Sequence, residues 1–194
     1  MIPRILVLPG DTAPGSPATR LGAEATRILA LTDAALTGAS LADYPLPFFD
    51  GAGAGEEAPQ NARLLAQRLA LQDGLLLVCP EINAGPPAVL KNALDWTAAA
   101  GTAERTERQP FARLVVALAS VGHGVEDGRA GLGALRATFA ALGADVLTAE
   151  FRLARPDEAF DAKGRLLDAA DRKRLDDWLD RLLDATRALG RQGG

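Results

Sequence analysis

A chain of 194 residues, of which 48% are hydrophobic and 24% charged, is long enough to bury one sizeable core and too apolar to stay disordered. Its formal net charge of −4, without any run of Lys or Arg, excludes a partner held mainly through nucleic-acid phosphates. No apolar stretch reaches the length of a membrane-spanning helix, and a single cysteine excludes an intramolecular disulfide. We therefore expect a cytoplasmic protein without membrane or nucleic-acid partners, folded as one domain over residues 1–190 with a frayed tail at 191–194.

Apolar runs of strand length alternate along the chain with longer stretches that carry Ala, Leu and Arg at helical spacing. In chain order, the predicted elements are a strand at 4–9, a helix at 17–31, a weaker strand at 39–44, a helix at 60–71, a strand at 74–80, a helix at 86–100, a strand at 112–120, a helix at 128–142, a strand at 144–151 and a helix at 168–189. This alternation predicts an α/β fold with a doubly wound, five-stranded parallel sheet and helices on both faces.

Ligands of such sheets bind at the carboxyl ends of strands, near the point where strand order reverses. That rule selects the loops at 10–16, 80–85 and 120–127. The Gly- and Pro-rich stretch at 45–59 is also expected to be a loop, and long loops are often functional. Cys79 ends an apolar run, which favours a buried, unreactive thiol.

The first selected loop leads from a strand into a helix, whose free amides and positive dipole end favour an anion. Gly10 and Gly15 permit close approach of the backbone to a phosphate, and Thr12 and Ser16 offer hydroxyl groups. The alternative is that Ser16 and Pro17 only cap and begin the helix. The loop lacks the Gly-Lys-Ser/Thr of a Walker sequence and does not match GxGxxG.

The second selected loop and the helix after it are the most specific part of the sequence. They read Pro80-Glu81-Ile82-Asn83-Ala84-Gly85-Pro86-Pro87-Ala88-Val89-Leu90-Lys91-Asn92-Ala93-Leu94-Asp95-Trp96. This resembles the segment Pro-Glu-Tyr-Asn-Gly-Ser-x-Pro-x-x-Leu-Lys-Asn-Ala-x-Asp-Trp of the NADPH-dependent FMN reductase family, which includes bacterial chromate and quinone reductases. The first loop resembles that family's phosphate loop, Gly-Ser-x-Arg-x-x-Ser-x-Asn, and Ser120-Val121-Gly122 resembles its Ser-x-Gly segment.

The resemblance implies a flavodoxin-like sheet of strand order 2-1-3-4-5 that binds FMN, with its phosphate at the first loop and its ring between the second and third. The backbone of 81–85 would donate N–H groups to the ring. His123 would lie near the ring edge or the nicotinamide; the alternative is an ordinary exposed loop histidine. The implied cofactor-binding residues are Gly10, Asp11, Thr12, Gly15, Ser16, Pro80, Glu81, Ile82, Asn83, Ala84, Ser120, Gly122 and His123.

The first loop departs from the family pattern. Where the family has Ser, Arg, Ser and Asn, this chain has Asp11, Ala13, Ser16 and Ala18, so only Ser16 is kept. An ionised Asp11 would repel a phosphate, and the loss of the Arg removes a charge-assisted contact. In the following helix, Trp96 is interpreted as packing, although the resemblance implies subunit contacts there.

The implied function is that of an oxidoreductase that passes hydride from NAD(P)H to FMN and on to a quinone or similar small acceptor, as a homodimer or homotetramer. A flavin-dependent reaction fits a chain with no Ser-His-Asp set and no metal-ligand cluster. The alternative is a flavodoxin-like binding or assembly module with weakened or lost FMN binding, which Asp11, Ala13 and Ala18 favour. A flavodoxin that only carries electrons matches the second motif poorly.

Overall fold

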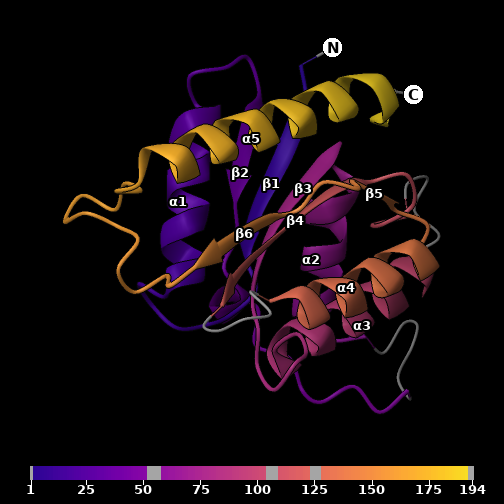
Figure 1. Ribbon diagram of the computed structural model, residues 1–194. Helices are drawn as coiled ribbons and strands as arrows, with labels where there is room; N and C mark the ends of the chain where they lie inside the picture. Colours follow the sequence, from indigo (N-terminus) through magenta and orange to yellow (C-terminus); the bar gives the residue numbers. More distant parts are fainter. Residues whose placement is uncertain (1, 52–57, 104–108, 123–127, 192–194) are drawn as a thin grey trace.

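A parallel β-sheet lies between two layers of helices in the computed structural model, which describes residues 2–51, 58–103, 109–122 and 128–191 (Figure 1). In chain order, its elements are β1 (Arg4–Pro9), α1 (Pro17–Leu29), β2 (Ala35–Gly38), the 3₁₀-helix η1 (Leu41–Asp43), α2 (Gln60–Ala70), β3 (Gly74–Pro80), α3 (Ala88–Ala103), β4 (Val115–Gly122), α4 (Arg129–Ala141), β5 (Asp145–Val146), β6 (Phe151–Ala154) and α5 (Ala169–Leu189). Within these residues, no helix combines the length and the hydropathy that crossing a bilayer requires.

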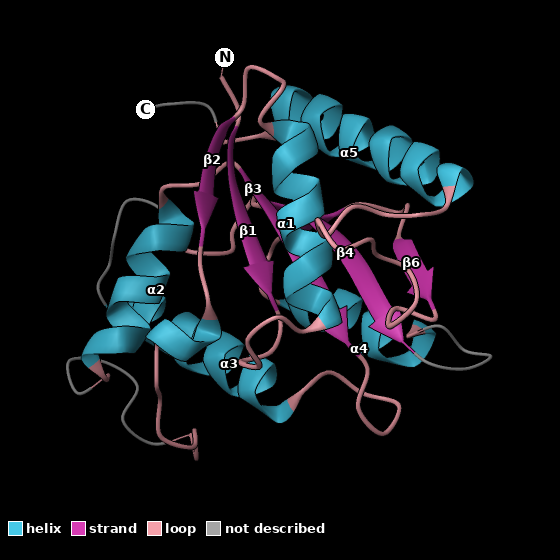
Figure 2. Cartoon of the chain, turned by 90° about the vertical axis from the view of Figure 1, so that its left-hand side faces the viewer, coloured by secondary structure: helices cyan, strands magenta, loops and turns pink. Residues whose placement is uncertain are grey.

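The strand order is β2-β1-β3-β4-β5, with β6 also paired to β4, and every pairing is parallel. This order confirms the expected flavodoxin-like, doubly wound sheet, and it reverses between β1 and β3. All the strand arrows run toward the same edge of the sheet in Figure 2. The loops that follow β1, β3 and β4 therefore meet at one edge.

Alternate side chains of each central strand enter two separate cores. On one face, Ile5 and Val7 of β1 pack with α1 and α5. On the other face, Leu6 and Leu8 of the same strand pack with residues of α2, α3 and α4. Because β3 and β4 are buried on both faces, they carry the unbroken apolar runs from which they were predicted.

The weaker strand predicted at 39–44 is wrong. The second strand is β2, which pairs with β1 from Ala35 opposite Arg4 to Gly38 opposite Val7. The predicted segment instead contains η1, because the Ser40 hydroxyl accepts a hydrogen bond from the Ala42 amide at 3.2 Å and begins a turn. As an edge strand that is only partly buried, β2 lacks the apolar run typical of a central strand.

The single strand predicted at 144–151 is two short strands. The first, β5, pairs with the start of β4, and the second, β6, pairs with its end. Between them, the Ala149 carbonyl accepts a hydrogen bond from Trp178 Nε1 at 3.1 Å, and Arg136 Nη2 donates to Glu150 Oε1 at 2.7 Å. These side chains of α5 and α4 engage the chain where a continuous strand would otherwise run.

Arg191, expected to begin a frayed tail, is only 6% exposed. Its guanidinium donates to backbone carbonyls at the amino edge of the sheet, those of Leu69 and Ala70 at the end of α2 and those of Gln72, Gln109, Pro110 and Ala112 in the loops. Orphan carbonyl groups need donors, and one arginine supplies several at once. The expectation is therefore wrong for Arg191, while 192–194 lie outside the described residues.

Candidate functional site

The first loop leaves the sheet in close contact with β3. The Gly10 amide donates to the Val78 carbonyl at 2.7 Å. A Cβ at this position would lie 3.0 Å from Leu90 Cδ2 and 3.2 Å from the Val78 oxygen, so packing within the protein requires the glycine. Gly15 has φ +68° and open space around its α-carbon, so it serves the turn and leaves that side of the loop accessible.

The donors of the first loop are directed at the chain's own carboxylate. Ser16 Oγ donates to Asp11 Oδ1 at 2.9 Å, and the Ala13 amide also donates to the Asp11 carboxylate. Ser16 Oγ at the same time accepts from the Thr19 amide at 3.1 Å and thereby caps α1. Both interpretations of Ser16 thus find support in its contacts: it caps the helix, and it faces an anion, which here is Asp11.

The second loop is a tight hairpin at the end of β3. Ile82 and Gly85 exchange two backbone hydrogen bonds, of 2.9 and 3.0 Å. The two residues between them, Asn83 and Ala84, have φ of 51° and 60°, as in a type I′ turn. The family pattern has Asn-Gly at these positions, and Gly adopts this conformation without strain, whereas Ala does not.

This hairpin leaves few amides for a ligand. The amides of Ile82 and Gly85 donate to each other's carbonyl groups inside the turn, so fewer of the backbone N–H groups expected at 81–85 remain to bind a flavin ring. Among the described residues, the amides of Asn83 and Ala84 have no acceptor, and both residues are exposed. The Ile82 side chain is 55% exposed beside them. The tip of the hairpin therefore offers two N–H groups and an apolar side chain.

Glu81 is occupied by a structural contact. Its Oε2 accepts a hydrogen bond from the Gly131 amide at 2.9 Å, in the first turn of α4. The N-cap residue of that helix is Gly128, which has no side chain to accept this bond, so Glu81 supplies the cap from 50 residues away. A Cβ at Gly131 would touch the Gly85 backbone at 3.4 Å, so α4 lies directly against the hairpin.

The third loop begins later than expected. Ser120 and Gly122 belong to β4, where Ser120 is paired with Cys79 of β3 and with Arg152 of β6. Ser120 is 1% exposed, and Gly128 covers it so closely that any side chain at Gly128 would collide with its Cβ. The side chain of Ser120 is therefore buried in this structure, and its place among the cofactor-binding residues stays a prediction. His123 lies outside the described residues.

Cys79 confirms the expected buried thiol. It is 1% exposed, and its Sγ–H donates to the Pro80 carbonyl at 3.1 Å. Burial, together with the negative charges of Glu81 and Asp11, raises the pKa of the Cys79 thiol to about 12. The thiol thus stays protonated at neutral pH, and two carboxylates lie within electrostatic reach of the end of β3.

The helix of the second motif, α3, holds the segment 45–50 against the fold. Asn92 Oδ1 accepts from the Phe49 amide at 2.8 Å, and Asn92 Nδ2 donates to the Pro47 carbonyl at 2.9 Å. Trp96 Nε1 donates to the same carbonyl at 2.7 Å, and its ring meets that of Phe49 edge-on at 4.9 Å. Packing is thus the role that the structure shows for Trp96. Phe48, between the two anchored residues, is 87% exposed.

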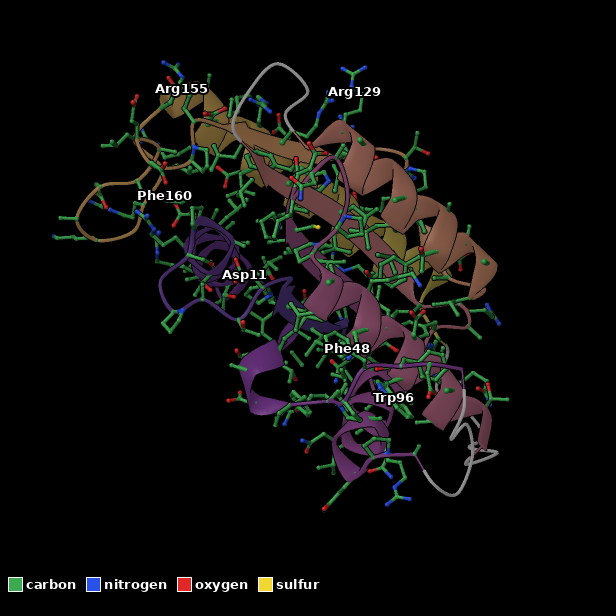
Figure 3. All side chains as sticks on the ribbon, turned by 90° about the horizontal axis from the view of Figure 1, so that it is seen from below. Asp11, Phe48, Trp96, Arg129, Arg155 and Phe160 are labelled. Atoms are coloured by element: carbon green, nitrogen blue, oxygen red, sulfur yellow. The ribbon has the colours of Figure 1, made fainter. Side chains whose placement is uncertain are left out.

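A cavity of about 280 Å³ lies between the first loop, η1 and α3. In Figure 3, Asp11 lies between Phe160 on one side and Phe48 with Trp96 on the other. The residues that line this cavity are Thr12, Leu41, Ala42, Tyr44, Pro45, Leu46, Val89, Asn92 and Ala93. Of these, only Thr12 was a candidate from the sequence. The Gly- and Pro-rich composition of 45–59 was the one signal for the lining at Pro45 and Leu46.

A larger cavity, of about 470 Å³, lies over α1 and the segment before α5. Four of its charged lining groups form ion pairs, Arg165 with Asp161 at 3.1 Å and Arg27 with Glu24, and Arg172 donates to the Leu166 carbonyl at 2.8 Å. It contains no residue of the loops that follow β1, β3 and β4, where the strand order reverses and the resemblance places the flavin. The smaller cavity is therefore the better candidate for a ligand.

Comparison with known proteins gives one consistent family. The sequence model of the NADPH-dependent FMN reductases matches residues 3–156. A 2-hydroxy-1,4-benzoquinone reductase of a Burkholderia species is 28% identical over 155 residues, which are 76% of this chain and 82% of the relative. A NAD(P)H-dependent FMN reductase of Pseudomonas aeruginosa is 33% identical over 129 residues, 64% of each chain.

Among solved structures, FerB of Paracoccus denitrificans, a flavoenzyme NAD(P)H:(acceptor) oxidoreductase, superposes with a TM-score of 0.78 and 22% identity. The superposition covers 98% of this chain and all of FerB, so it supports the fold along the whole length. The family match confirms the resemblance drawn from the Pro80–Trp96 motif. It also confirms the expected class of enzyme, an oxidoreductase, and its cofactors, FMN with NAD(P)H as electron donor.

Proposed function

Because the chain belongs to the NADPH-dependent FMN reductase family, we propose that it passes electrons from NAD(P)H through a flavin to a quinone or similar small acceptor. The observation that carries the proposal is the hairpin after β3, in which the amides of Asn83 and Ala84 stand free at the edge where such sheets bind ligands. The relative named for 2-hydroxy-1,4-benzoquinone supports a quinone as the acceptor.

The described residues fit the ring of the flavin better than its phosphate. The two hairpin amides suit the polar ring edge, and Ile82 offers an apolar surface to its face. The first loop, in contrast, directs its Ser16 hydroxyl and Ala13 amide at Asp11. FMN, when bound, supplies the hydride chemistry, so the chain needs to bind and orient its ligands and needs no nucleophile of its own.

Three residues position this ring site. Glu81 ties the hairpin to the first turn of α4, where its carboxylate acts as a cap. Asn92 and Trp96 fix the segment 45–50, which forms one wall of the cavity beside the first loop. The ring site therefore rests on hydrogen bonds between segments far apart in the sequence, which keeps it preformed before ligand arrives.

The main test combines flavin binding with turnover. Titration with FMN and with riboflavin, followed by quenching of flavin fluorescence, should give saturable binding. NADH or NADPH oxidation should then depend on added flavin and accelerate with 1,4-benzoquinone. A protein that binds neither flavin would refute the proposal and favour the alternative, a flavodoxin-like binding module.

Substitution at the hairpin locates the ring. Ile82→Asp places a charge where the apolar face is expected and should weaken binding of both flavins at least about tenfold. Leu189→Asp is the matched control, because Leu189 is 50% exposed at the end of α5, and its substitution should change neither affinity. Equal effects of the two substitutions would contradict this placement.

The proposal includes a cytoplasmic location and a homodimer or homotetramer. Exposed apolar side chains at Phe48, Ile82 and Val89 lie on the elements that flank the candidate site, which is consistent with a second subunit there. Size-exclusion chromatography with light scattering tests the oligomeric state. A monomer at micromolar concentration would contradict this part of the proposal.

A further inference from the structure

Asp11 holds the position that a flavin phosphate would need. Its carboxylate accepts the Ser16 hydroxyl at 2.9 Å and the Ala13 amide, the hydrogen bonds with which a strand-to-helix loop holds an anion. Ser16 is also the one member of the family's phosphate-binding set that this chain keeps. Two donors of the loop, the Ser16 hydroxyl and the Ala13 amide, are therefore already bonded to an anion of the chain itself.

The charges around Asp11 do not offset a second anion. Glu81 faces the same end of β3, and both carboxylates act on Cys79. Arg20, in the next turn of α1, directs its guanidinium over the Phe160 ring, 5.4 Å from the ring centre. Burial raises the pKa of Asp11 against the opposing effect of the Ser16 and Ala13 hydrogen bonds, so the protein already makes this site costly for negative charge.

A phosphate monoester carries one to two negative charges at neutral pH and would compete with Asp11 for the same two donors. It can bind these two donors only when the Asp11 carboxylate leaves them. The ring site at the hairpin consists of backbone amides and an apolar side chain, so it does not depend on the phosphate. The chain thus disfavours the phosphate of a flavin while it leaves the site for the ring unaffected.

We propose that Asp11 is a specificity-determining residue, a resident anion in the phosphate subsite, through which the chain binds riboflavin at least as tightly as FMN. This inference rests on the proposed flavin site and adds to it the form of flavin that the site selects. The physical reason is competition between two anions for one pair of donors. A neutral ribityl chain meets no such competition, since its hydroxyl groups can donate to the Asp11 carboxylate.

The deciding experiment measures the dissociation constants of FMN and riboflavin by fluorescence quenching for the unmodified protein and for Asp11→Asn. Asparagine keeps the shape of aspartate and the acceptor oxygen for Ser16 and Ala13, but removes the charge. The unmodified protein should bind riboflavin as tightly as FMN or more tightly. Asp11→Asn should tighten FMN binding by about tenfold or more and change riboflavin binding less than about threefold.

The control is Asp145→Asn, which removes the same unit of charge from an exposed residue of β5 and should leave both affinities unchanged. FMN bound at least tenfold more tightly than riboflavin by the unmodified protein, with no change in Asp11→Asn, would overturn the inference and leave the proposed function intact. Equal tightening of both flavins would also overturn it, because Asp11 would then act on the ring site. Binding of neither flavin by any variant would overturn the proposed function, and this inference with it.

Discussion

Asn92 should stabilise the fold far more than the exposed Lys91 beside it on α3, because it holds the backbone of a distant segment. Its side chain forms hydrogen bonds of 2.8 and 2.9 Å, one accepted from Phe49 and one donated to Pro47, across 43 and 45 residues. Asn92→Ala removes both bonds and leaves the partly buried Phe49 amide without its acceptor. At about 1 kcal/mol for each bond, the free energy of unfolding should fall by about 2 kcal/mol.

For a chain of this size, that loss corresponds to a decrease in Tm of about 4–8 °C. Urea unfolding followed by circular dichroism measures the free energy, and differential scanning calorimetry measures Tm. The matched control is Lys91→Ala, which removes the exposed ion pair of 2.7 Å with Asp95 on the same helix and should lower stability by only about 0.3–0.5 kcal/mol.

The same substitution should also weaken flavin binding, since the segment that Asn92 holds supplies Pro45 and Leu46 to the cavity wall. Trp96→Phe removes the third hydrogen bond, which ends on the same Pro47 carbonyl, so its effect should not add fully to that of Asn92→Ala. If Asn92→Ala and Lys91→Ala lower stability equally, the segment is held by other contacts and the reasoning fails.

Three further predictions concern single contacts, each read by urea unfolding. Glu81→Ala should lower stability by about 1 kcal/mol because the first turn of α4 loses its cap, whereas Glu81→Gln, which keeps an acceptor oxygen, should lose about half as much; equal losses would contradict the hydrogen-bond contribution, and no loss in Glu81→Gln would contradict the contribution of the charge. Ala84→Gly should raise stability by about 1 kcal/mol because Ala84 has φ 60°, while Ala137→Gly, in the middle of α4, should lower it by a similar amount; the same sign for both would show that the hairpin is unstrained. Arg191→Met should lower stability by about 3 kcal/mol or more, since several loop carbonyls lose their donor, and a loss below 1 kcal/mol would indicate that the end of the chain is dispensable.

The local sequence was sufficient to predict the bounds of a strand where the strand is buried on both faces. The strands β1 and β3 were predicted with their observed bounds because both are buried between two helical layers and must be apolar throughout. The Pro80–Trp96 motif identified the family because its residues are contiguous. The edge strand β2 was misplaced because a partly exposed strand has no such signature, and 144–151 was read as one strand because its interruption depends on Trp178 and Arg136.

The roles of the candidate site residues depended on contacts that sequence patterns cannot show. Asp11 was expected to repel a phosphate, but only the structure shows its carboxylate bonded to the donors that remain. Glu81 and Ser120 stay predictions as flavin-binding residues, and the structure adds what the sequence could not show: the Glu81 side chain caps α4, and Ser120 is buried beneath Gly128. The sequence alone correctly predicted Cys79 as a buried thiol, because the apolar run that it ends is local.

The sequence by itself determined the fold class, the order of the sheet and the family, because periodicity and contiguous motifs depend on neighbours along the chain. Only the tertiary structure decided what each polar side chain binds, since those partners lie 43 residues away for Asn92, 50 for Glu81 and 122 for Arg191. A buried or half-buried polar group must find a partner, and which partner is within 3 Å depends on how the sheet and helices pack.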